Sequence, residues 1–284
     1  MAEILKGAPV AAALSEQLIR RAEKLKDSGV VPTLAILRVG ERPDDISYET
    51  GAMKRCDKIG IAVRHFLLSA NCTKDQLLDT ICQINEDDSI HGCLMFRPLP
   101  DKEMEAAACA LLAPEKDVDC MTSGSLASVF TGQGAGYPPC TAQACIEILD
   151  HYGIELTGKR AAVIGRSLVI GKPVSMMLQQ RNATVTMCHT RTVDMPAVCR
   201  EAEIVIAAAG KAGVVDATYA VSGQVIVDVG INVDENGKLC GDVKFDAVEP
   251  IVAAITPVPA GVGSVTTAVL AKHVIEAAEK AREN

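Results

Sequence analysis

The stretch RAAVIGRSLVIGKPVSMML, residues 160–178, decides the fold class of this chain. Its first six residues form an apolar run typical of a buried strand, and a helix with proline in its first turn is expected from residue 171. The loop between strand and helix carries Gly165 and Gly171. Free N–H groups and the helix dipole face such a loop, which favours the pyrophosphate of a dinucleotide. Because the spacing is not G-x-G-x-x-G, an ordinary strand-to-helix turn is the alternative.

The next expected strand, ATVTMC at 183–188, indicates which dinucleotide is bound. Sites that prefer NAD place an Asp or Glu at the end of this strand, where it binds the ribose 2′-OH. Here the strand is followed by His189, Thr190 and Arg191, and Arg166 lies in the glycine loop. A hydroxyl and two guanidinium groups suit a 2′-phosphate, so NADP is favoured over NAD, which stays possible. In the alternative, both arginines are solvated surface residues. A structural role is favoured for His189 over a catalytic one.

Strand-like apolar runs alternate with helical patterns along nearly the whole chain. Near-continuous apolar strands between helices predict parallel sheets covered on both faces, here in two α/β units. The Gly/Pro-rich segment 131–141 is the expected junction, and the unit after it is the Rossmann-like one. The expected strands are 33–39, 61–68, 92–98, 160–165, 183–188, 203–209, 224–230 and 251–258. The expected helices are 8–27, 44–59, 73–86, 102–112, 141–152, 171–181 and 264–282.

The composition of the 284 residues narrows the class of protein. A net charge of −8 argues against nucleic acid and against an anionic membrane surface as partners. No apolar run reaches the roughly 18–20 residues of a membrane span, and the Ala-rich N-terminus is interpreted as an amphipathic helix, not a signal peptide. The eleven cysteines are scattered without metal-ligand spacing. This pattern favours reduced thiols in a cytoplasmic protein and predicts no metal site.

The helix expected at 44–59 follows an apolar strand, where α/β proteins usually place a site. Tyr48, Ala52, Cys56 and Ile59 share one face of this helix. Lys54 is two residues past Ala52, about 200° around the helix, so it does not share that face. The helix therefore offers a tyrosine to a site without a lysine beside it.

Segments throughout the chain resemble the methylenetetrahydrofolate dehydrogenase/cyclohydrolase family (FolD-type). The resemblance covers nearly the whole chain, in order. In the first half it rests on LAILRVGERPDDISY (34–48), GCLMFRPLP (92–100) and PEKDVDC (114–120). In the second half it rests on VIGRSLVIGKPV (163–174), ATVTMCHTRT (183–192), VIVDVGIN (225–232), GDVKFDAV (241–248) and ITPVPAGVGSVTTAVL (255–270).

This resemblance implies a two-domain α/β fold and an activity. The folate-binding catalytic domain would comprise residues 1–138 plus 266–284, with the C-terminal helix returning to it, and the NAD(P)-binding Rossmann-like domain would comprise 139–265. A homodimer with a folate cleft between the domains is implied. The implied reaction oxidises 5,10-methylenetetrahydrofolate to the methenyl form and passes a hydride to NAD(P). Tetrahydrofolate derivatives would be the small-molecule partners.

The resemblance also implies site residues. Asp119 would bind the pterin and Tyr48 would line the folate; without the resemblance, a loop-capping aspartate is an equal alternative for Asp119. Pro259 and Gly263 would close the cleft. The cofactor contacts would be Gly165, Arg166, Ser167, Thr190 and Ile231. Arg191, which follows the strand expected at 183–188 and suits a 2′-phosphate, is a further predicted cofactor contact.

The chain departs from the family pattern at two positions that matter for chemistry. Family members carry a lysine four residues after the tyrosine and a glutamine before Leu-Pro-Leu-Pro, and here these positions are Ala52 and Phe96. The leucine place after the glutamine is taken by Arg97. Lesser changes are Ala260 in the usual Gly-Gly pair, Ser264–Val265 for Pro-Met, and PPCTAQA at 138–144.

These departures separate the two activities of the family. Hydride transfer is driven by a nitrogen lone pair and needs alignment, without an obligatory acid or base. Cyclohydrolase chemistry moves protons and needs a positioned carrier, which Ala52 and Phe96 cannot provide. We therefore expect a dehydrogenase with weak or absent cyclohydrolase activity. The alternatives are a bifunctional enzyme in which Lys54 swings in, a dehydrogenase for another substrate, and a catalytically silent folate- or nucleotide-binding protein.

Overall fold

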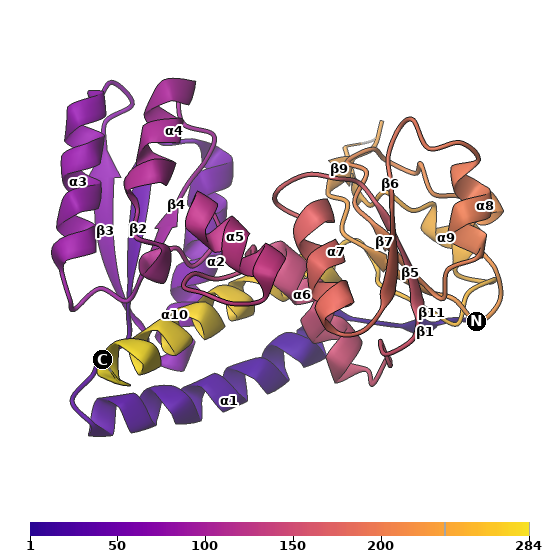
Figure 1. The fold of residues 1–284 in the computed structure, drawn as a ribbon, viewed down its shortest axis with the longest axis horizontal. Helices are drawn as coiled ribbons and strands as arrows, with labels where there is room; N and C mark the ends of the chain where they lie inside the picture. The colour runs from indigo at the N-terminus through magenta and orange to yellow at the C-terminus, as the bar shows by residue number, and fades with distance from the viewer. Residues whose placement is uncertain (236, 284) are drawn as a thin grey trace. The chain divides into compact units, whose positions relative to one another are not determined.

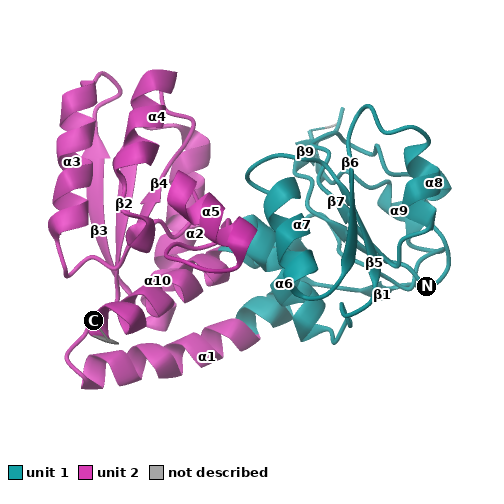
Figure 2. Cartoon of the chain, viewed as in Figure 1, with its two compact units in different colours: residues 1–12, 141–266 teal, residues 13–140, 267–284 magenta. Residues whose placement is uncertain are grey.

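The computed structural model describes residues 1–235 and 237–283 of the chain (Figure 1). It divides into two compact units (Figure 2). One unit comprises residues 1–12 and 141–266 and is called the six-stranded unit below. The other comprises residues 13–140 and the chain from Thr267 on, and is called the three-stranded unit.

The three-stranded unit is built on a small parallel sheet. Its strands are β2 (Thr33–Val39), β3 (Ala62–Leu68) and β4 (Gly92–Met95), in the order β3-β2-β4. All seven residues of the central strand β2 are buried, as expected of a strand covered on both faces. The helices are α1 (Gly7–Asp27, which begins in the other unit), α2 (Pro43–Ile59), α3 (Lys74–Glu86), α4 (Lys102–Leu111), α5 (Ser123–Thr131) and α10 (Thr266–Glu283), with the 3₁₀ turn η1 (Pro114–Lys116).

The six-stranded unit has the doubly wound topology expected from the glycine-loop stretch. Its sheet runs in the order β1-β11-β8-β7-β5-β6, and every pairing is parallel. These strands are β1 (Glu3–Ile4), β5 (Arg160–Ile164), β6 (Thr184–Cys188), β7 (Ile204–Ala207), β8 (Val225–Asp228) and β11 (Ala254–Ile255). The other elements are α6 (Cys140–His151), α7 (Gly171–Gln180), α8 (Met195–Arg200), α9 (Phe245–Val248), the antiparallel pair β9 (Asn232–Val233) and β10 (Leu239–Cys240), and the turns η2 (Ala217–Tyr219) and η3 (Val262–Ser264).

The first twelve residues pack with the six-stranded unit, whereas the sequence predicts them in the folate-binding domain. Strand β1 pairs in parallel with β11, and the Leu5 N–H donates to the Ile255 carbonyl at 2.9 Å. The segment therefore belongs to the six-stranded unit. A strand of two residues is too short to show a periodic pattern in the sequence, so β1 is recognised only from its pairing with β11.

The last expected strand, 251–258, is also corrected. Only Ala254–Ile255 is a strand, because Pro257 and Pro259 follow and have no N–H to donate to a sheet. Helices α5, α8 and the short α9 are not among the expected helices. The seven expected helices are all present, with ends shifted by at most two residues.

Candidate functional site

The glycine loop after β5 lies where the topology of the six-stranded sheet reverses. Strand β5 is flanked by β6 on one side and β7 on the other, and the crevice at such carboxyl ends is the usual dinucleotide site. Gly165 has a φ of +129°, and a Cβ there would collide with the Ala208 carbonyl. A Cβ on Gly171 would collide with the Gly165 carbonyl. Both glycines are thus required by close approach of backbone to backbone.

Ser167 connects this loop to the beginning of α7. Its Oγ accepts the N–H of Ile170 at 3.1 Å, and its carbonyl accepts the N–H of Lys172 at 3.0 Å. Both Arg166 and Ser167 are exposed to solvent. The loop therefore presents a guanidinium group and the N-terminus of a ten-residue helix, an arrangement that suits phosphate.

The turn after β6 carries Thr190 and Arg191, both exposed. The backbone N–H of Arg191 donates to His189 Nδ1 at 3.1 Å, and the N–H of His189 donates to Thr192 Oγ1 at 2.9 Å. The His189 ring thus accepts a hydrogen bond within its own turn, which favours the structural role over a catalytic one.

A cavity of about 220 Å³ lies beyond the carboxyl ends of β8 and β11. It brings together three residues predicted for two different purposes: Ile231 as a cofactor contact, and Pro259 and Gly263 as cleft-closing residues. The side chain of Ile231 is 72% exposed, which is unusual for isoleucine and leaves it available to a ligand.

Helix α2 presents the face expected from its sequence. Ala52, Cys56 and Ile59 are buried and Tyr48 is half-buried, whereas Lys54 is exposed. The rings of Tyr48 and Phe96 meet edge to face, with centroids 6.1 Å apart. Ala52 is fully buried one turn along from Tyr48. The two substituted positions thus contribute a methyl group and an aromatic ring, neither of which transfers protons.

The loop 114–120 holds two aspartates in different environments. Asp117 is fully buried, and its carboxylate accepts the N–H groups of Met121 and Thr122 at 2.9 and 2.7 Å. Asp119 is half-buried and accepts the N–H of Cys140 at 2.9 Å. Burial raises the pKa of Asp119, and the Cys140 N–H partly offsets this. Asp117 therefore braces the loop, while Asp119 is the carboxylate that a ligand can reach.

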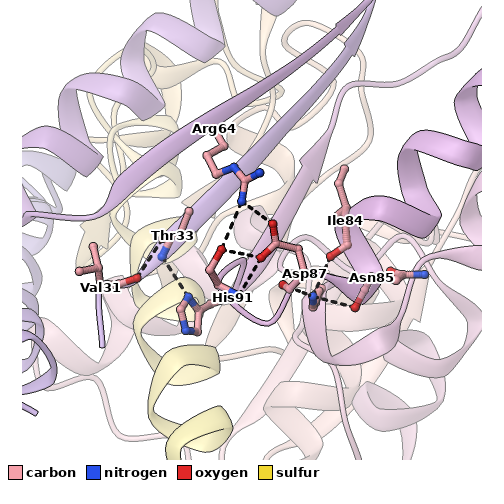
Figure 3. Close-up of polar contacts among 9 residues, drawn as sticks. Val31, Thr33, Arg64, Ile84, Asn85, Asp87 and His91 are labelled. Atoms are coloured by element: carbon pink, nitrogen blue, oxygen red, sulfur yellow. Dashed lines mark hydrogen bonds and ion pairs between the residues drawn. The ribbon is translucent and has the colours of Figure 1, made fainter. Parts of the chain in front are cut away.

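Lys116 anchors the same loop to the end of α3. Ile84, Asn85 and Asp87 lie together at this end of the helix (Figure 3). Lys116 Nζ donates to the carbonyls of Ile84, Asn85 and Asp87 at 2.7, 2.8 and 2.8 Å. An ammonium group is well matched to the unpaired carbonyls and negative dipole of a helix C-terminus. Lys116 and Asp117 had not been singled out from the sequence, although they lie within the motif PEKDVDC that drew attention to Asp119.

The described residues contain no group of His, Cys, Asp and Glu side chains able to hold a metal ion. All eleven cysteines are free. In the same part of the chain, no helix combines the length and apolar character needed to cross a membrane.

The glycine loop at the reversal of a parallel six-stranded sheet defines a dinucleotide-binding α/β protein, carried on one chain with a second α/β unit. Comparison with known families gives the particular class. Residues 5–119 match the catalytic domain of tetrahydrofolate dehydrogenase/cyclohydrolase, and residues 139–282 match the NAD(P)-binding domain of that enzyme. The chain belongs to the tetrahydrofolate dehydrogenase/cyclohydrolase family.

Individual relatives agree with this assignment over the full chain. The bifunctional protein FolD of Clostridioides difficile (strain 630) is 50% identical over 275 residues, 97% of this chain and 96% of the relative. The crystal structure of the bifunctional enzyme FolD of Campylobacter jejuni has a TM-score of 0.93 at 35% identity, with 99% of each chain covered. The Trypanosoma brucei FolD, determined with NADP and an inhibitor, has a TM-score of 0.91 at 32% identity and covers 100% of this chain and 99% of its own.

Proposed function

We propose that this chain oxidises 5,10-methylenetetrahydrofolate to 5,10-methenyltetrahydrofolate, with NADP as hydride acceptor, and that it has little or no cyclohydrolase activity. The observation that carries the second half is Ala52, fully buried on the Tyr48 face of α2 where family members have lysine. The first half is supported by the glycine loop with its two constrained glycines and by the presence of Tyr48 and Asp119.

The dehydrogenase step asks little of the protein beyond alignment. A nitrogen lone pair next to the methylene carbon expels the hydride, and the nicotinamide cofactor supplies the acceptor. In the proposal Asp119 accepts hydrogen bonds from the amino and ring N–H groups of the pterin, which are strengthened by its charge. Tyr48 positions the folate, and Pro259 and Gly263 are further proposed substrate-binding residues. The proposed cofactor contacts are Gly165, Arg166, Ser167, Thr190, Arg191 and Ile231.

Cyclohydrolase activity makes a further demand that this chain does not meet. Water must add to the methenyl carbon while protons move on and off nitrogen, and a positioned proton carrier typically contributes about 10²–10⁴-fold to such steps. Ala52 and Phe96 carry no transferable proton. Lys54 is exposed on another face of α2, and the guanidinium of Arg97 has donors but no acceptor, which makes it a poor proton carrier.

A bifunctional enzyme is the second candidate, and the name of the C. difficile relative, bifunctional protein FolD, favours it. In that case Lys54 would have to reach the substrate from its exposed position. The residue substitutions favour the first candidate, because a buried alanine leaves the Tyr48 face without a proton carrier.

Two assays on the purified protein test the proposal. NADPH absorbance is followed with methylenetetrahydrofolate and NADP, and loss of the methenyl chromophore is followed separately. We expect NADPH to form and the methenyl compound to decay no faster than in buffer. Enzymatic hydrolysis that disappears in Lys54→Ala would establish the bifunctional candidate instead. NADP binding without NADPH formation would favour a silent binding protein.

The preference for NADP has its own test. Exposed Arg166, Thr190 and Arg191 are suited to a 2′-phosphate, and the T. brucei relative was determined with NADP. Arg191→Ala should raise KM for NADP by about tenfold, the order expected for one lost phosphate contact, and leave KM for NAD within a factor of two. Equal effects on KM for both cofactors would contradict the assignment of Arg191 to the 2′-phosphate of NADP.

We also propose that the protein is a homodimer in the cytoplasm. Sedimentation velocity measures the oligomeric state.

A further inference from the structure

Two buried aspartates connect three loops at the carboxyl edge of the six-stranded sheet. Asp228, the last residue of β8, is 3% exposed, and its carboxylate accepts three backbone N–H groups. These belong to Gly230 at 2.9 Å and to Asp242 and Val243, each at 3.0 Å. Asp228 thereby fixes the backbone on both sides of the second aspartate, Asp242.

Asp242 continues the connection to two further segments. It is fully buried, and its carboxylate accepts the backbone N–H groups of Gly210 and Lys211 at 2.9 Å each. It also accepts the side-chain amide of Asn232 at 2.9 Å. One carboxylate thus ties the loop after β7 to the segment after β8, in which Ile231 lies next to Asn232.

The backbone passes closely against both carboxylates. A Cβ on Gly241 would collide with the Asp228 carboxylate, and a Cβ on Gly230 would collide with the backbone and carboxylate of Asp242. Both neighbours are glycine because the chain passes directly against the two carboxylates. A side chain at either glycine would displace these contacts, which link the loops after β7 and β8.

These two loops follow strands β7 and β8, whereas the glycine loop follows β5, on the other side of the point where the strand order reverses. In a doubly wound sheet the two mononucleotide halves of the ligand bind across the reversal point, one over each half of the sheet. The half with β5 and β6 carries Gly165–Ser167 and Thr190–Arg191, suited to the pyrophosphate and the adenosine 2′-phosphate. The nicotinamide end would therefore bind over the half with β7 and β8, where Ile231 is exposed.

We propose that Asp242 is a positioning residue for the nicotinamide half of the dinucleotide, acting through the loops that follow β7 and β8. It does not touch the ligand itself. It fixes Gly210 and Lys211 on one side and, through Asn232, Ile231 on the other. The inference rests on the proposed placement of the cofactor and does not depend on which substrate is oxidised.

The test compares a whole dinucleotide with half of one. Asp242→Asn replaces one accepting oxygen with an NH₂ group, which faces a donor and breaks at least one of these hydrogen bonds. Binding of NADP and of 2′,5′-ADP, which lacks the nicotinamide mononucleotide half, is measured by titration calorimetry, with NAD and ADP in parallel. We expect NADP affinity to fall about fivefold or more, the effect of one lost hydrogen bond, and 2′,5′-ADP affinity to stay within about twofold.

Two further variants complete the design. Asp246→Asn makes the same chemical change at an exposed position of α9 and should leave both affinities unchanged. Asn232→Ala removes only the link to the Ile231 segment, and it decides the question if Asp242→Asn does not fold. A merely structural role for Asp242 would weaken both ligands equally, and that result, or unchanged NADP affinity in the folded variants, would overturn the inference.

The failure of the proposed function is visible separately. A wild-type protein that binds NADP but forms no NADPH with methylenetetrahydrofolate would remove the proposed reaction. The differential affinity between NADP and 2′,5′-ADP would still be measurable in that protein and would still judge the role of Asp242.

Discussion

The ring of Tyr48 meets the ring of Phe96 edge-on, with centroids 6.1 Å apart and planes at 79°. Tyr48 lies on α2 and Phe96 directly follows β4, so the pair joins the two segments that carry the substituted positions. Edge-to-face pairs of this kind contribute about 0.5–1.5 kcal/mol beyond the area they bury. Phe96 therefore has a packing role on the proposed folate face, where a glutamine would instead offer hydrogen bonds.

The first prediction restores the missing groups. The double variant Ala52→Lys with Phe96→Gln should gain methenyl hydrolysis by about 10²-fold or more over wild type, because a positioned proton carrier contributes on that scale. The rate is read from the decay of the methenyl chromophore. Phe96→Gln alone is the control, since it removes the aromatic pair without adding a proton carrier, and it should stay at the wild-type rate. A double variant that folds, retains dehydrogenase activity and shows no gain would contradict the explanation.

The second prediction concerns the anchor of the Asp119 loop. Lys116→Met should lower the free energy of unfolding by roughly 2 kcal/mol, because three carbonyls at the end of α3 lose a charged donor. Urea unfolding measures the change. The exposed Lys54 supplies the control, and Lys54→Met should change stability by less than about 0.5 kcal/mol. Equal stability of both variants would mean that the Lys116 contacts contribute nothing in solution.

Features with a local signature were predictable from the sequence, and features made by distant partners were not. The glycine loop and the main helices are local patterns of glycine, proline and apolar spacing. The role of Lys116 depends on a carbonyl 32 residues away, and that of Asp242 on an N–H also 32 residues away. No window of sequence contains both partners.

The same reasoning explains why strand β1 and the short length of β11 were not predictable. Strand β1 is too short to show alternation and exists only through its pairing with β11. The expected strand at 251–258 is mostly apolar, but Pro257 within it and Pro259 just after it limit sheet pairing to Ala254–Ile255. On the proposed folate face the sequence spacing is sufficient, since it separates Lys54 from Ala52, and Ala52 is buried whereas Lys54 is exposed.

The third prediction tests the glycine loop. Gly171→Ala should lower NADP affinity by about tenfold or more and destabilise the protein by about 1–3 kcal/mol, because the new methyl group collides with the Gly165 carbonyl. Gly51→Ala is the matched control within α2, where the nearest atom would be 3.9 Å away. There the change should stabilise by about 0.5–1 kcal/mol, since alanine is the better helix former. Calorimetric titration and thermal unfolding measure both effects. Identical behaviour of the two variants would argue against a constrained loop.

The fourth prediction concerns backbone strain at Ala260, which occupies a position where the family usually has glycine. Its φ is +79°, a left-handed conformation that alanine adopts at a cost, and its side chain is exposed. Ala260→Gly should therefore stabilise the protein by about 0.5–1 kcal/mol. Ala12→Gly, at an exposed position of α1, should destabilise it by about 1 kcal/mol. Opposite signs in chemical denaturation support the strain, and destabilisation by both changes would speak against it.

The fifth prediction is a pH dependence that originates at His273. This side chain on α10 is buried, stacks on Tyr137 with centroids 5.0 Å apart, and has Nδ1 2.9 Å from the Val118 carbonyl. Burial, with a smaller contribution from Lys272 and Lys280, lowers the pKa of His273 to about 4 from 6.5.

Because the folded pKa lies below the unfolded one, the unfolded chain takes up the proton first as pH falls. The stability that neutral His273 provides is therefore complete above about pH 6.5 and is lost as pH falls from there towards 4. The shift corresponds to roughly 3 kcal/mol. His273→Asn keeps a donor for the Val118 carbonyl and cannot be protonated in this range. Urea unfolding from pH 7 to pH 4 should thus show a steeper loss for wild type than for His273→Asn, while the exposed control His151→Asn should follow wild type. Parallel curves for wild type and His273→Asn would show that His273 does not cause the acid sensitivity.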